Sequence, residues 1–410
     1  MKFRKLTVLL VVMLIILTGC SSSKPAGTTP QNNTIPAANN VSTEPDTEPD
    51  TPPEVTPVTV SLVSVGDMLM HASASNPAIQ ADGTYNYDYL FEHVKNAISS
   101  ADIAIANNEV IMGGNDKGNI GYPAFNVRTE LGDAEVKAGF DVFLGATNHA
   151  VDQGINGILN CVSYWKNSHP EAGVLGIYDS KEASDQIYVK DVNGIKIAML
   201  NYTYGTNGIA VPEQYNYTLK LMTEDKKTEI AAEIAKAKEI SDFVIVFPHW
   251  GTEYNLGTTK EQESWAQWFA DQGVDLIIGT HPHVVEPVKW LDGASGNKTL
   301  VYYSLGNFVS VQYYNYSMLG AMAEVSITKD SSGTYISGND IDFLVTHYTS
   351  GRSVITTYFL DDYTDELAAS HAILFEPSDK FMKVNANYPF NVAGLKALAK
   401  SICPEYTSDY

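Results

Sequence analysis

Cysteine and positive charge are both scarce in this sequence. Only three cysteines occur among 410 residues, and after Cys20 only Cys161 and Cys403 remain. These are too few for a disulfide framework, although a single bridge between Cys161 and Cys403 stays open. The 26 lysines and arginines are outnumbered by 48 aspartates and glutamates, which gives a formal net charge of −22. This charge argues against a nucleic-acid-binding protein and against a footprint on an anionic membrane surface.

Long apolar runs are also rare, and the clearest one lies at the N-terminus. Residues 6–17 are almost entirely apolar and follow the positively charged Lys2, Arg4 and Lys5. The run is too short for a comfortable transmembrane helix, because about 20 residues are needed to cross a bilayer. A positive segment followed by a short apolar run is typical of a signal peptide, here over residues 1–19.

The segment Leu17-Thr18-Gly19-Cys20 ends this run and is followed by three serines. A small-residue pair before a cysteine resembles the lipobox of bacterial lipoproteins, in which the cysteine is acylated and becomes the mature N-terminus. The resemblance implies lipidation at Cys20 and a place on the extracytoplasmic face of the cell membrane. The alternative is a plain membrane anchor with an incidental cysteine. In either case the rest of the chain lies outside the cytoplasm.

Residues 20–57 contain almost no large apolar side chains and consist mainly of Ser, Thr, Pro, Asn, Ala, Asp and Glu. Such a segment cannot bury enough apolar surface to offset its ordering entropy, so we expect a disordered tether. The remaining chain, roughly 350 residues, is long enough for one large domain with an appendage. We expect a domain over residues 58–325 and a C-terminal extension over residues 326–410.

From residue 58 onward, short apolar runs alternate with amphipathic stretches. Strands are expected at 58–65, 102–106, 140–146, 195–203, 243–247, 274–278 and 299–303. Helices are expected at about 87–99, 128–138 and 223–241, with Thr223 as an N-cap, and around Trp265 and Trp268. This alternation predicts an α/β fold with a mostly buried sheet covered on both faces. A hairpin around 330–333 and a last helix near 392–401 are expected in the extension.

Polar side chains follow the predicted strands at the points where these strands end. They are Asp67 with His71, Glu109, the pair Asn148-His149, His249, and His281 with His283. In α/β sheets, the carboxyl ends of strands deliver side chains into a common crevice. Carboxylate, amide and imidazole groups are ligands of divalent transition metals, and two close ions need about this many ligands, usually with a bridging carboxylate. The pattern therefore predicts a metal or active site.

Each of these residues also has a simpler interpretation when it is taken alone. An aspartate after a strand is usually a cap, Asn148-His149 could be a capping pair, and His249 could be a half-buried histidine beside Trp250. The sharpest element is His281-Pro282-His283. Two imidazoles separated by one residue point the same way on an extended segment, and proline keeps such a segment extended. Capping explains poorly why all of these residues follow separate strands.

Six segments carry a resemblance to a known family. They are Gly66-Asp67-Met68-Leu69-Met70-His71, Ala106-Asn107-Asn108-Glu109, Thr147-Asn148-His149-Ala150-Val151-Asp152-Gln153-Gly154, Pro248-His249-Trp250-Gly251-Thr252-Glu253-Tyr254, Gly279-Thr280-His281-Pro282-His283 and Tyr303-Ser304-Leu305-Gly306-Asn307-Phe308. In this order they closely resemble the bacterial capsule-synthesis CapA family, also called poly-γ-glutamate capsule proteins, over about residues 59–312. That family is similar to calcineurin-like metallophosphoesterases, which implies a four-layer α/β/β/α sandwich.

The resemblance implies roles for the site residues and two divalent metal ions, such as manganese, zinc or iron. The implied metal ligands are Asp67, Glu109, Asn148, His249, His281 and His283. Glu109 stands where the family's relatives have a bridging aspartate, and Asn108 stands where an apolar residue is usual. The standard first motif is Asp-x-His, whereas His71 lies four residues after Asp67. His71 is therefore a ligand, a substrate contact or neither.

The remaining candidates concern proton transfer and substrate contact. His149 would donate a proton to a leaving group, oriented by Asp152 or by a backbone carbonyl. Glu253 and Tyr254 are candidates for substrate contact, and Tyr254 is equally explained by packing. Asn307 would shape the floor of the pocket or close a turn.

The family resemblance implies a metal-dependent hydrolase or transferase in capsule synthesis, export or anchoring. Its substrate would be poly-γ-glutamate or another anionic surface polymer, or a precursor, and its partners capsule synthase or export subunits. The alternatives are a non-catalytic binding subunit of a capsule machine and a general secreted phosphoesterase. Because the protein itself is acidic, only the metal centre could attract a polyanion.

Overall fold

The computed structural model describes residues 56–375, 387–408 and 410, within the compact unit Glu54–Tyr410. The predicted signal peptide (1–19), the lipidation site Cys20 and nearly all of the predicted tether (20–57) lie outside the described residues. Among the residues described, the structure contains no helix of the length and apolarity that crossing a membrane requires.

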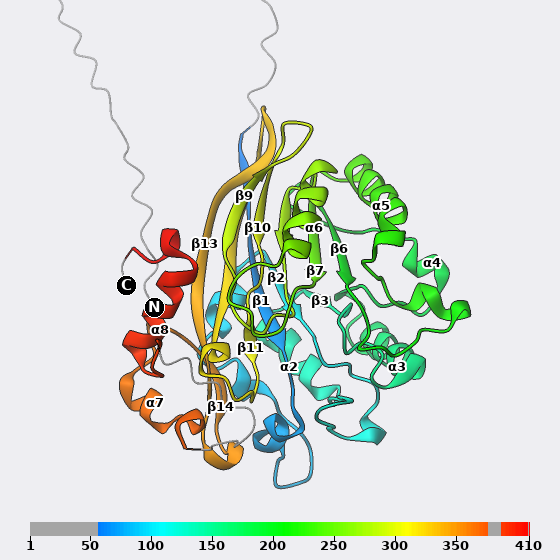
Figure 1. The fold of residues 1–410 in the computed structure, drawn as a ribbon. Helices are drawn as coiled ribbons and strands as arrows, with labels where there is room; N and C mark the ends of the chain where they lie inside the picture. The colour runs from blue at the N-terminus through cyan, green and yellow to red at the C-terminus, as the bar shows by residue number, and fades with distance from the viewer. Residues whose placement is uncertain (1–55, 376–386, 409) are drawn as a thin grey trace, which may run out of the picture. The chain divides into compact units, whose positions relative to one another are not determined.

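The first inner layer is an eight-stranded sheet with the order β14-β13-β12-β1-β2-β3-β4, in which β11 also pairs with β1 (Figure 1). Its strands are β1 (Val58–Met68), β2 (Ile103–Asn107), β3 (Val142–Leu144), β4 (Gly173–Leu175), β11 (Asn307–Val309), β12 (Leu319–Asp330), β13 (Gly333–Tyr348) and β14 (Ile355–Phe359). Strands β1 to β4 run parallel to one another, so their carboxyl ends lie at one edge of the sheet. Every residue of β2 and β3 is buried, as is usual for parallel strands covered on both faces.

The second inner layer is a six-stranded sheet with the order β5-β6-β7-β8-β10-β9. Its strands are β5 (Tyr188–Val192), β6 (Ile195–Thr203), β7 (Phe243–His249), β8 (Leu276–Ile278), β9 (Val288–Asp292) and β10 (Lys298–Tyr302). Alternate residues of β7 point to opposite faces. Phe243 and Phe247 belong to the core shared with the first sheet, whereas Val244 and Val246 pack in a separate core beneath helices. The two sheets therefore face each other across one hydrophobic core.

Helices form the two outer layers. On the first sheet, α1 (Lys95–Ser100), α2 (Glu130–Ala138) and α3 (Gly154–Ser168) bury side chains such as Trp165. On the second sheet, α5 (Lys227–Ile240) and α6 (Lys260–Asp271) cover the outer face, and α4 (Lys181–Ser184) is a single turn. The predicted four-layer α/β/β/α sandwich is thus confirmed.

The chain beyond residue 325 continues the first sheet. Strand β12 pairs antiparallel with β1 along its length, from Val58↔Lys329 to Val65↔Met322, and β13 and β14 follow in the same sheet. The predicted boundary at residue 325 therefore falls inside β12, whereas the predicted hairpin at 330–333 is the turn between β12 and β13. Helices α7 (Asp365–Ser370) and α8 (Val392–Ile402) lie beside β13 in Figure 1. Cys161 and Cys403 are both buried and free.

Two predicted helices begin differently in the structure. The stretch 223–241 opens with a 3₁₀ turn over Glu224–Lys226, and α5 begins only at Lys227, so the side chain of Thr223 caps no α-helix. The stretch 87–99 is split into a 3₁₀ turn at Asp88–Leu90 and the short α1. A complete capping box occurs instead at α6, where Thr259 and Gln262 bond to each other's backbone amides.

Gly66 lets β11 approach β1 next to Asp67. The Asp67 amide donates to the Gly306 carbonyl at 2.8 Å, and Asp67 is in register with Asn307. A Cβ atom at Gly66 would lie 1.9 Å from the Gly306 oxygen, which no side chain tolerates. Glycine at position 66 is therefore required for the strand contact that fixes Asp67.

Candidate metal centre

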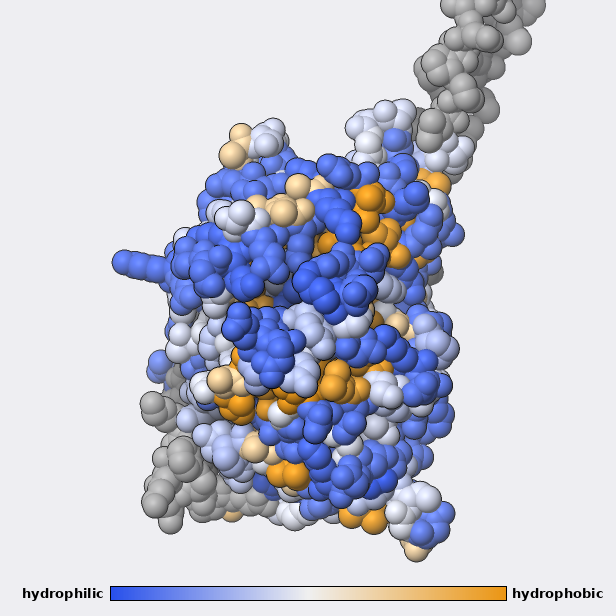
Figure 2. Space-filling model, turned by 90° about the vertical axis from the view of Figure 1, so that its right-hand side faces the viewer, coloured by the Kyte–Doolittle hydropathy of each residue, from blue (hydrophilic) through white to orange (hydrophobic). Residues whose placement is uncertain are grey.

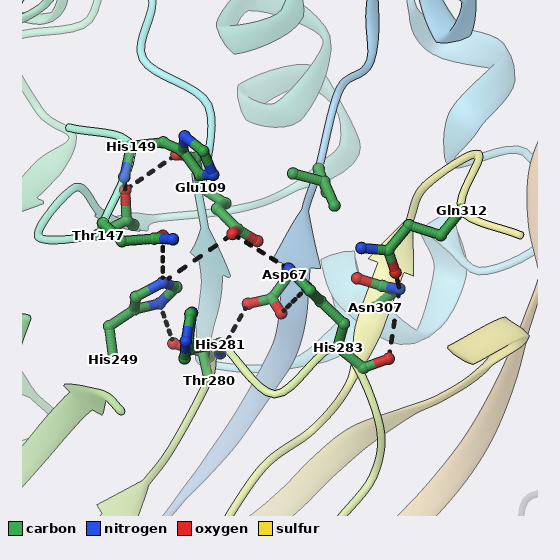
Figure 3. A network of polar contacts seen from close by, with 12 residues as sticks. Asp67, Glu109, Thr147, His149, His249, Thr280, His281, His283, Asn307 and Gln312 are labelled. Atoms are coloured by element: carbon green, nitrogen blue, oxygen red, sulfur yellow. Dashed lines mark hydrogen bonds and ion pairs between the residues drawn. The ribbon is translucent and has the colours of Figure 1, made fainter. Parts of the chain in front are cut away.

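The predicted ligands meet where strands of both sheets end (Figure 3). Asp67 lies near the end of β1 and Glu109 follows β2, both in the first sheet. His249 ends β7, while His281 and His283 follow β8, in the second sheet. In Figure 3 these five side chains point toward one another, and all five are buried. The structure thus brings together the carboxylates of one sheet and the imidazoles of the other.

Two groups of three side chains could each hold a metal ion. One group is Glu109, His249 and His281, and the other is Asp67, Glu109 and His283. Within each group, one potential ligand atom per residue lies within 4.8 Å of the others. Glu109 belongs to both groups, which is the arrangement of a carboxylate that bridges two ions in a two-metal site.

Glu109 is fully buried and lacks hydrogen-bond donors. Neither of its carboxylate oxygens accepts a hydrogen bond from the described residues. Its Oε1 atom lies 3.6 Å from His283 Nε2 and 4.0 Å from His249 Nε2. Burial raises the pKa of Glu109; His283 opposes the increase, and the neighbouring Asp67 adds to it. A buried carboxylate that accepts no hydrogen bond is costly to retain even with His283 nearby, and a bound cation lowers that cost, so the donor set fits divalent metal ions.

Asp67 is held between the two sheets. Its Oδ1 atom accepts a hydrogen bond from Asn107 Nδ2 at 2.8 Å, and its Oδ2 atom lies 3.0 Å from His283 Nδ1. When Nδ1 of His283 faces Asp67, its Nε2 atom faces Glu109, as a ligand to a shared ion requires. Burial lowers the pKa of His283, but the carboxylates of Glu109 and Asp67 outweigh it and raise the pKa to about 9.

His249 is oriented by a second pair of contacts. Its Nδ1 atom lies 2.9 Å from the hydroxyl of Thr280, and its Nε2 atom lies 2.9 Å from Asn148 Oδ1. Burial lowers the pKa of His249, and His281 lowers it further, so the ring is neutral. The neutral ring and the amide oxygen of Asn148 therefore face the same point, beside Glu109.

His281 and His283 do not lie on an extended segment, so that prediction was wrong. Their φ angles are +100° and +59°, which places both residues in the left-handed region, and their ring centroids are 6.0 Å apart. With this backbone, the ring of His281 belongs to the ligand group of Glu109 and His249, and the ring of His283 belongs to the group of Asp67 and Glu109. Nδ1 of His281 has no hydrogen-bond partner among the described residues. Such strained residues persist where the surrounding structure holds them in place.

His149 and Asp152 form a pair beside the ligand groups. His149 Nδ1 lies 2.7 Å from Asp152 Oδ2, which also accepts a hydrogen bond from the Phe125 amide at 2.7 Å. The ring of Phe125 meets the His149 ring edge-on at 4.7 Å. Of the two orienting groups that were expected for His149, the structure shows the carboxylate of Asp152.

The other predicted residues surround the centre at different depths. His71 is partly exposed, lies edge-on to Phe125 at 5.3 Å and has a pKa lowered to about 4, chiefly by burial. Neither ligand group among the described residues includes His71. Glu253 is exposed. Tyr254 lies near His283, with ring centroids 5.8 Å apart, and also packs on Tyr314 at 4.3 Å.

Asn307 lies deeper than these residues and is fully buried. Its Nδ2 atom donates to Gln312 Oε1 at 2.9 Å and to the Ser317 carbonyl at 3.1 Å. These bonds tie β11 to the segment that follows it, beside His283 (Figure 3).

The structure explains the unusual Asn108. Its Nδ2 atom donates to Glu135 Oε2 at 3.1 Å, and both side chains are buried between β2 and α2. Burial raises the pKa of Glu135 to about 8. Asn108 therefore serves a buried carboxyl group on the helix side of the sheet, away from the ligand groups.

Several residues of the site were not found from the sequence. Asn107 and Thr280 lie inside quoted motifs, but their contacts with Asp67 and His249 join distant parts of the chain. Tyr204 and Asn207 follow β6, and they contact His281 and Asn148 respectively. A polar run directly after a predicted strand was the available signal for these two.

Comparison with known proteins agrees with the motifs. Residues 61–312 match the family described as bacterial capsule synthesis protein PGA_cap. The chain belongs to this family. Two relatives of known name are similar: the PGA biosynthesis protein CapA of Bacillus subtilis (strain 168), 32% identical over 196 residues, and the capsule biosynthesis protein CapA of Bacillus anthracis, 28% identical over 256 residues. The first match covers 48% of this chain and 49% of the relative, and the second covers 61% and 59%. The chain thus spans only about half of the length of these relatives.

Solved structures similar to this PGA_cap family member include two phosphohydrolases. A phosphatase of Mycoplasma pneumoniae is 15% identical with a TM-score of 0.44, over 71% of this chain and 95% of that chain. The calcineurin-like phosphoesterase YfkN of Bacillus subtilis is 12% identical with a TM-score of 0.36, over 70% and 91%.

Proposed function

We propose that this protein is a metal-dependent hydrolase or transferase that acts on a cell-surface polymer, or on its precursor, during capsule synthesis. The observation that carries the proposal is Glu109, a buried carboxylate without hydrogen-bond donors that is shared by two ligand groups. Such a group is costly in a purely structural domain, because His283 is near Glu109 but donates no hydrogen bond to it, whereas a metal cation would compensate the buried charge. The family supports the link to capsule synthesis.

The chain's own residues fit a simple division of labour. Divalent cations at such a site, for example manganese, zinc or iron, supply Lewis-acid chemistry toward the bond that is cleaved. Asp67, Glu109, Asn148, His249, His281 and His283 would hold two of them. The Nδ1 atom of His149 faces Asp152, so its Nε2 atom is left to give a proton to the leaving group.

The substrate and location follow from the relatives and from the N-terminal sequence. One relative is named for biosynthesis of PGA, which supports poly-γ-glutamate or another anionic surface polymer as the substrate class. The lipobox-like segment ending at Cys20 supports a lipid anchor on the extracytoplasmic face of the cell membrane. Capsule synthase or export subunits are the proposed partners. His71, Glu253 and Tyr254 remain candidates for substrate contact at the rim of the centre.

A non-catalytic binding subunit is the second candidate, and the surface gives one observation in its favour. The face drawn in Figure 2 is mostly hydrophilic but carries hydrophobic patches among the polar residues. Large hydrophobic side chains exposed on the domain include Tyr122, which is 79% exposed, and Ile79, which is 54% exposed. Exposed apolar patches mark interaction sites in many proteins. This candidate requires no metal at the centre.

Metal content separates these functions. The full chain would be purified in detergent, incubated with manganese, zinc or iron, and analysed for bound metal by elemental analysis. Glu109→Gln removes the shared charge without changing the side chain's size, and Glu135→Gln is the matched control, because Glu135 is equally buried outside the centre. We expect metal in the parent and in Glu135→Gln, and a loss of metal in Glu109→Gln.

The metal-loaded chain would then be screened with a chromogenic phosphoester and with γ-glutamyl polymers. Cleavage of polymer alone supports the proposal, whereas cleavage of the simple ester alone supports a general phosphoesterase. If the parent chain binds none of the three metals, the hydrolase proposal is wrong and the binding subunit remains.

A further inference from the structure

The loop after β6 touches the centre from a side that no motif marked. Tyr204 stands over His281 with ring centroids 4.7 Å apart, and its backbone amide donates to the His249 carbonyl at 3.0 Å. Asn207, three residues further on, accepts a hydrogen bond at Oδ1 from Asn148 Nδ2, with 3.2 Å between the atoms. The Nδ2 atom of Asn207 lies 3.4 Å from His149 Nδ1. One short loop thus contacts three proposed ligands, His249, His281 and Asn148, and the proposed proton donor.

The contact between Asn207 and Asn148 decides which end of an amide faces the metal. An asparagine side chain ends in one oxygen and one NH₂ group, and only the oxygen can bind a cation. Because the NH₂ group of Asn148 is held by Asn207, its oxygen faces His249 Nε2 at 2.9 Å. That point lies beside Glu109, within the ligand group that contains His249 and His281. Without the acceptor on Asn207, the Asn148 amide would keep the contact of its oxygen with His249 but lose a partner of its NH₂ group, so its orientation would be held less strictly.

The backbone conformation at Asn207 is one that asparagine adopts readily. Its φ angle is +52°, in the left-handed region that asparagine and glycine tolerate best, and Gly208 follows with a φ of +79°. The residue is exposed, so its side chain is not needed to fill the core. An exposed residue that reaches inward to buried Asn148 is better explained by the site than by folding.

We propose that Asn207 is a positioning residue that orients the amide of Asn148, so that the Asn148 oxygen can bind one of the two metal ions. This inference rests on the proposed function, because it assumes that metal ions bind at the centre. The residue acts through Asn148 and is not itself a ligand. Partners of ligand residues commonly change metal affinity by about 10–100-fold when they are removed.

The chain offers a matched control. Asn193 has nearly the same backbone conformation, with a φ of +54°, is also exposed and is also followed by a glycine, Gly194, but it lies in the turn between β5 and β6. Asn193→Gly therefore repeats the backbone change of Asn207→Gly away from the centre. Asn207→Asp keeps an oxygen that can accept the hydrogen bond, so it serves as the conservative variant.

In the experiment, the metal-free full chain and its variants are titrated with Mn²⁺, and isothermal titration calorimetry measures the binding. The melting temperatures of the metal-free proteins are measured in parallel. We expect Asn207→Gly to weaken one of two binding steps by about 10–100-fold. The other step and the melting temperature of the metal-free chain should stay unchanged. The Mn²⁺ affinities of Asn207→Asp should stay within a few-fold of those of the parent, and the affinities of Asn193→Gly should equal those of the parent.

A double-variant comparison isolates the mechanism. A carboxylate has two equivalent oxygens and needs no orientation, so adding Asn207→Gly to Asn148→Asp should cause no further loss of Mn²⁺ affinity. The inference is overturned if Asn207→Gly binds both ions as the parent does, or if the loss persists in the Asn148→Asp background. If the parent chain binds no Mn²⁺, the proposed function and this inference are both overturned. If the parent binds Mn²⁺ and Asn207→Gly binds it equally well, only this inference is overturned.

Discussion

The two sheets contribute different kinds of side chain to the centre. The first sheet supplies the carboxylates Asp67 and Glu109, at the ends of parallel strands, and the second supplies the imidazoles of His249, His281 and His283. Each ligand group draws on both sheets, because Glu109 joins two histidines in one group, and Asp67 and Glu109 join one histidine in the other. A bound ion would therefore connect the sheets across the end of the shared core, and stability and metal binding should be linked.

Metal removal is the strongest test of this comparison. A ligand that binds only the folded state at about 100 times its Kd stabilises that state by about 2.7 kcal/mol. We expect saturating Mn²⁺ to raise the melting temperature of the parent chain and a chelator to reverse the rise. In the double variant Asp67→Ala, His281→Ala, both sheets lose a ligand and the shift should vanish. Differential scanning calorimetry measures it, and an equal shift in the double variant would contradict the idea.

Replacing one ligand from each sheet in turn tests whether the two ligand groups bind their ions separately. Asp67 and His281 belong to different ligand groups. Asp67→Asn and His281→Gln should each remove one ion and leave the other, so each single variant should bind about half as much metal as the parent. Elemental analysis after gel filtration gives the ratio, with Glu135→Gln as a control that should bind as much as the parent. Complete loss in both single variants would show one cooperative centre instead of two separable ones.

A substitution of His149 tests the proposed proton transfer to the leaving group and leaves the proposed metal ligands unchanged. Removal of a general acid typically costs about 10²–10⁴-fold in rate. We expect His149→Asn to lose about this much on substrates with a basic leaving group and far less on aryl esters, whose leaving groups need no proton. Its metal content should equal that of the parent. Steady-state turnover on paired substrates measures the difference, and an equal loss on both kinds would assign His149 another role.

The last test concerns the first sheet alone and leaves both ligand groups unchanged. Burial raises the pKa of Glu135 to about 8, whereas an unfolded glutamate titrates near 4.3. Between these values the folded state keeps a proton that the unfolded state has released, so the stabilisation is complete at low pH and is lost as pH rises toward 8. The slope is at most about 1.4 kcal/mol per pH unit. Glu135→Gln should flatten the decline in melting temperature between pH 5 and 8, and an unchanged profile would contradict the shifted pKa.

The sequence allowed the strand-end residues and an α/β fold to be predicted, because both rest on local patterns, whereas the four-layer sandwich was implied by the family resemblance. Strand β6 was predicted with its observed bounds, and Asp67, Glu109 and the late histidines lie together as expected. Long-range pairing left no such pattern. The pairing of β12 with β1 joins residues far apart in the chain, so the C-terminal part looked like an appendage although it continues the first sheet.

The same limit applies within the site. The contact of Asn207 with Asn148 crosses between loops of the two sheets, and neither residue's neighbours in the sequence indicate it. The left-handed backbone at His281 and His283 was missed for another reason. A Pro between two residues favours an extended chain in isolation, but here the His281 amide bonds to Asp67 and the Pro282 carbonyl to the Tyr254 amide, and these contacts between distant parts of the chain accompany the left-handed backbone.

The centre depends on Gly66, although this residue has no side chain that could bind a metal ion. The oxygen of Gly306 occupies the space that a Cβ would need, so every other amino acid at position 66 pushes β11 and the neighbouring Asp67 apart. In a saturation mutagenesis library, position 66 should therefore show the same intolerance as the ligand positions, although it donates nothing to an ion. The constraint on position 66 is therefore steric, and we expect it to be as strict as the chemical constraint on the ligands.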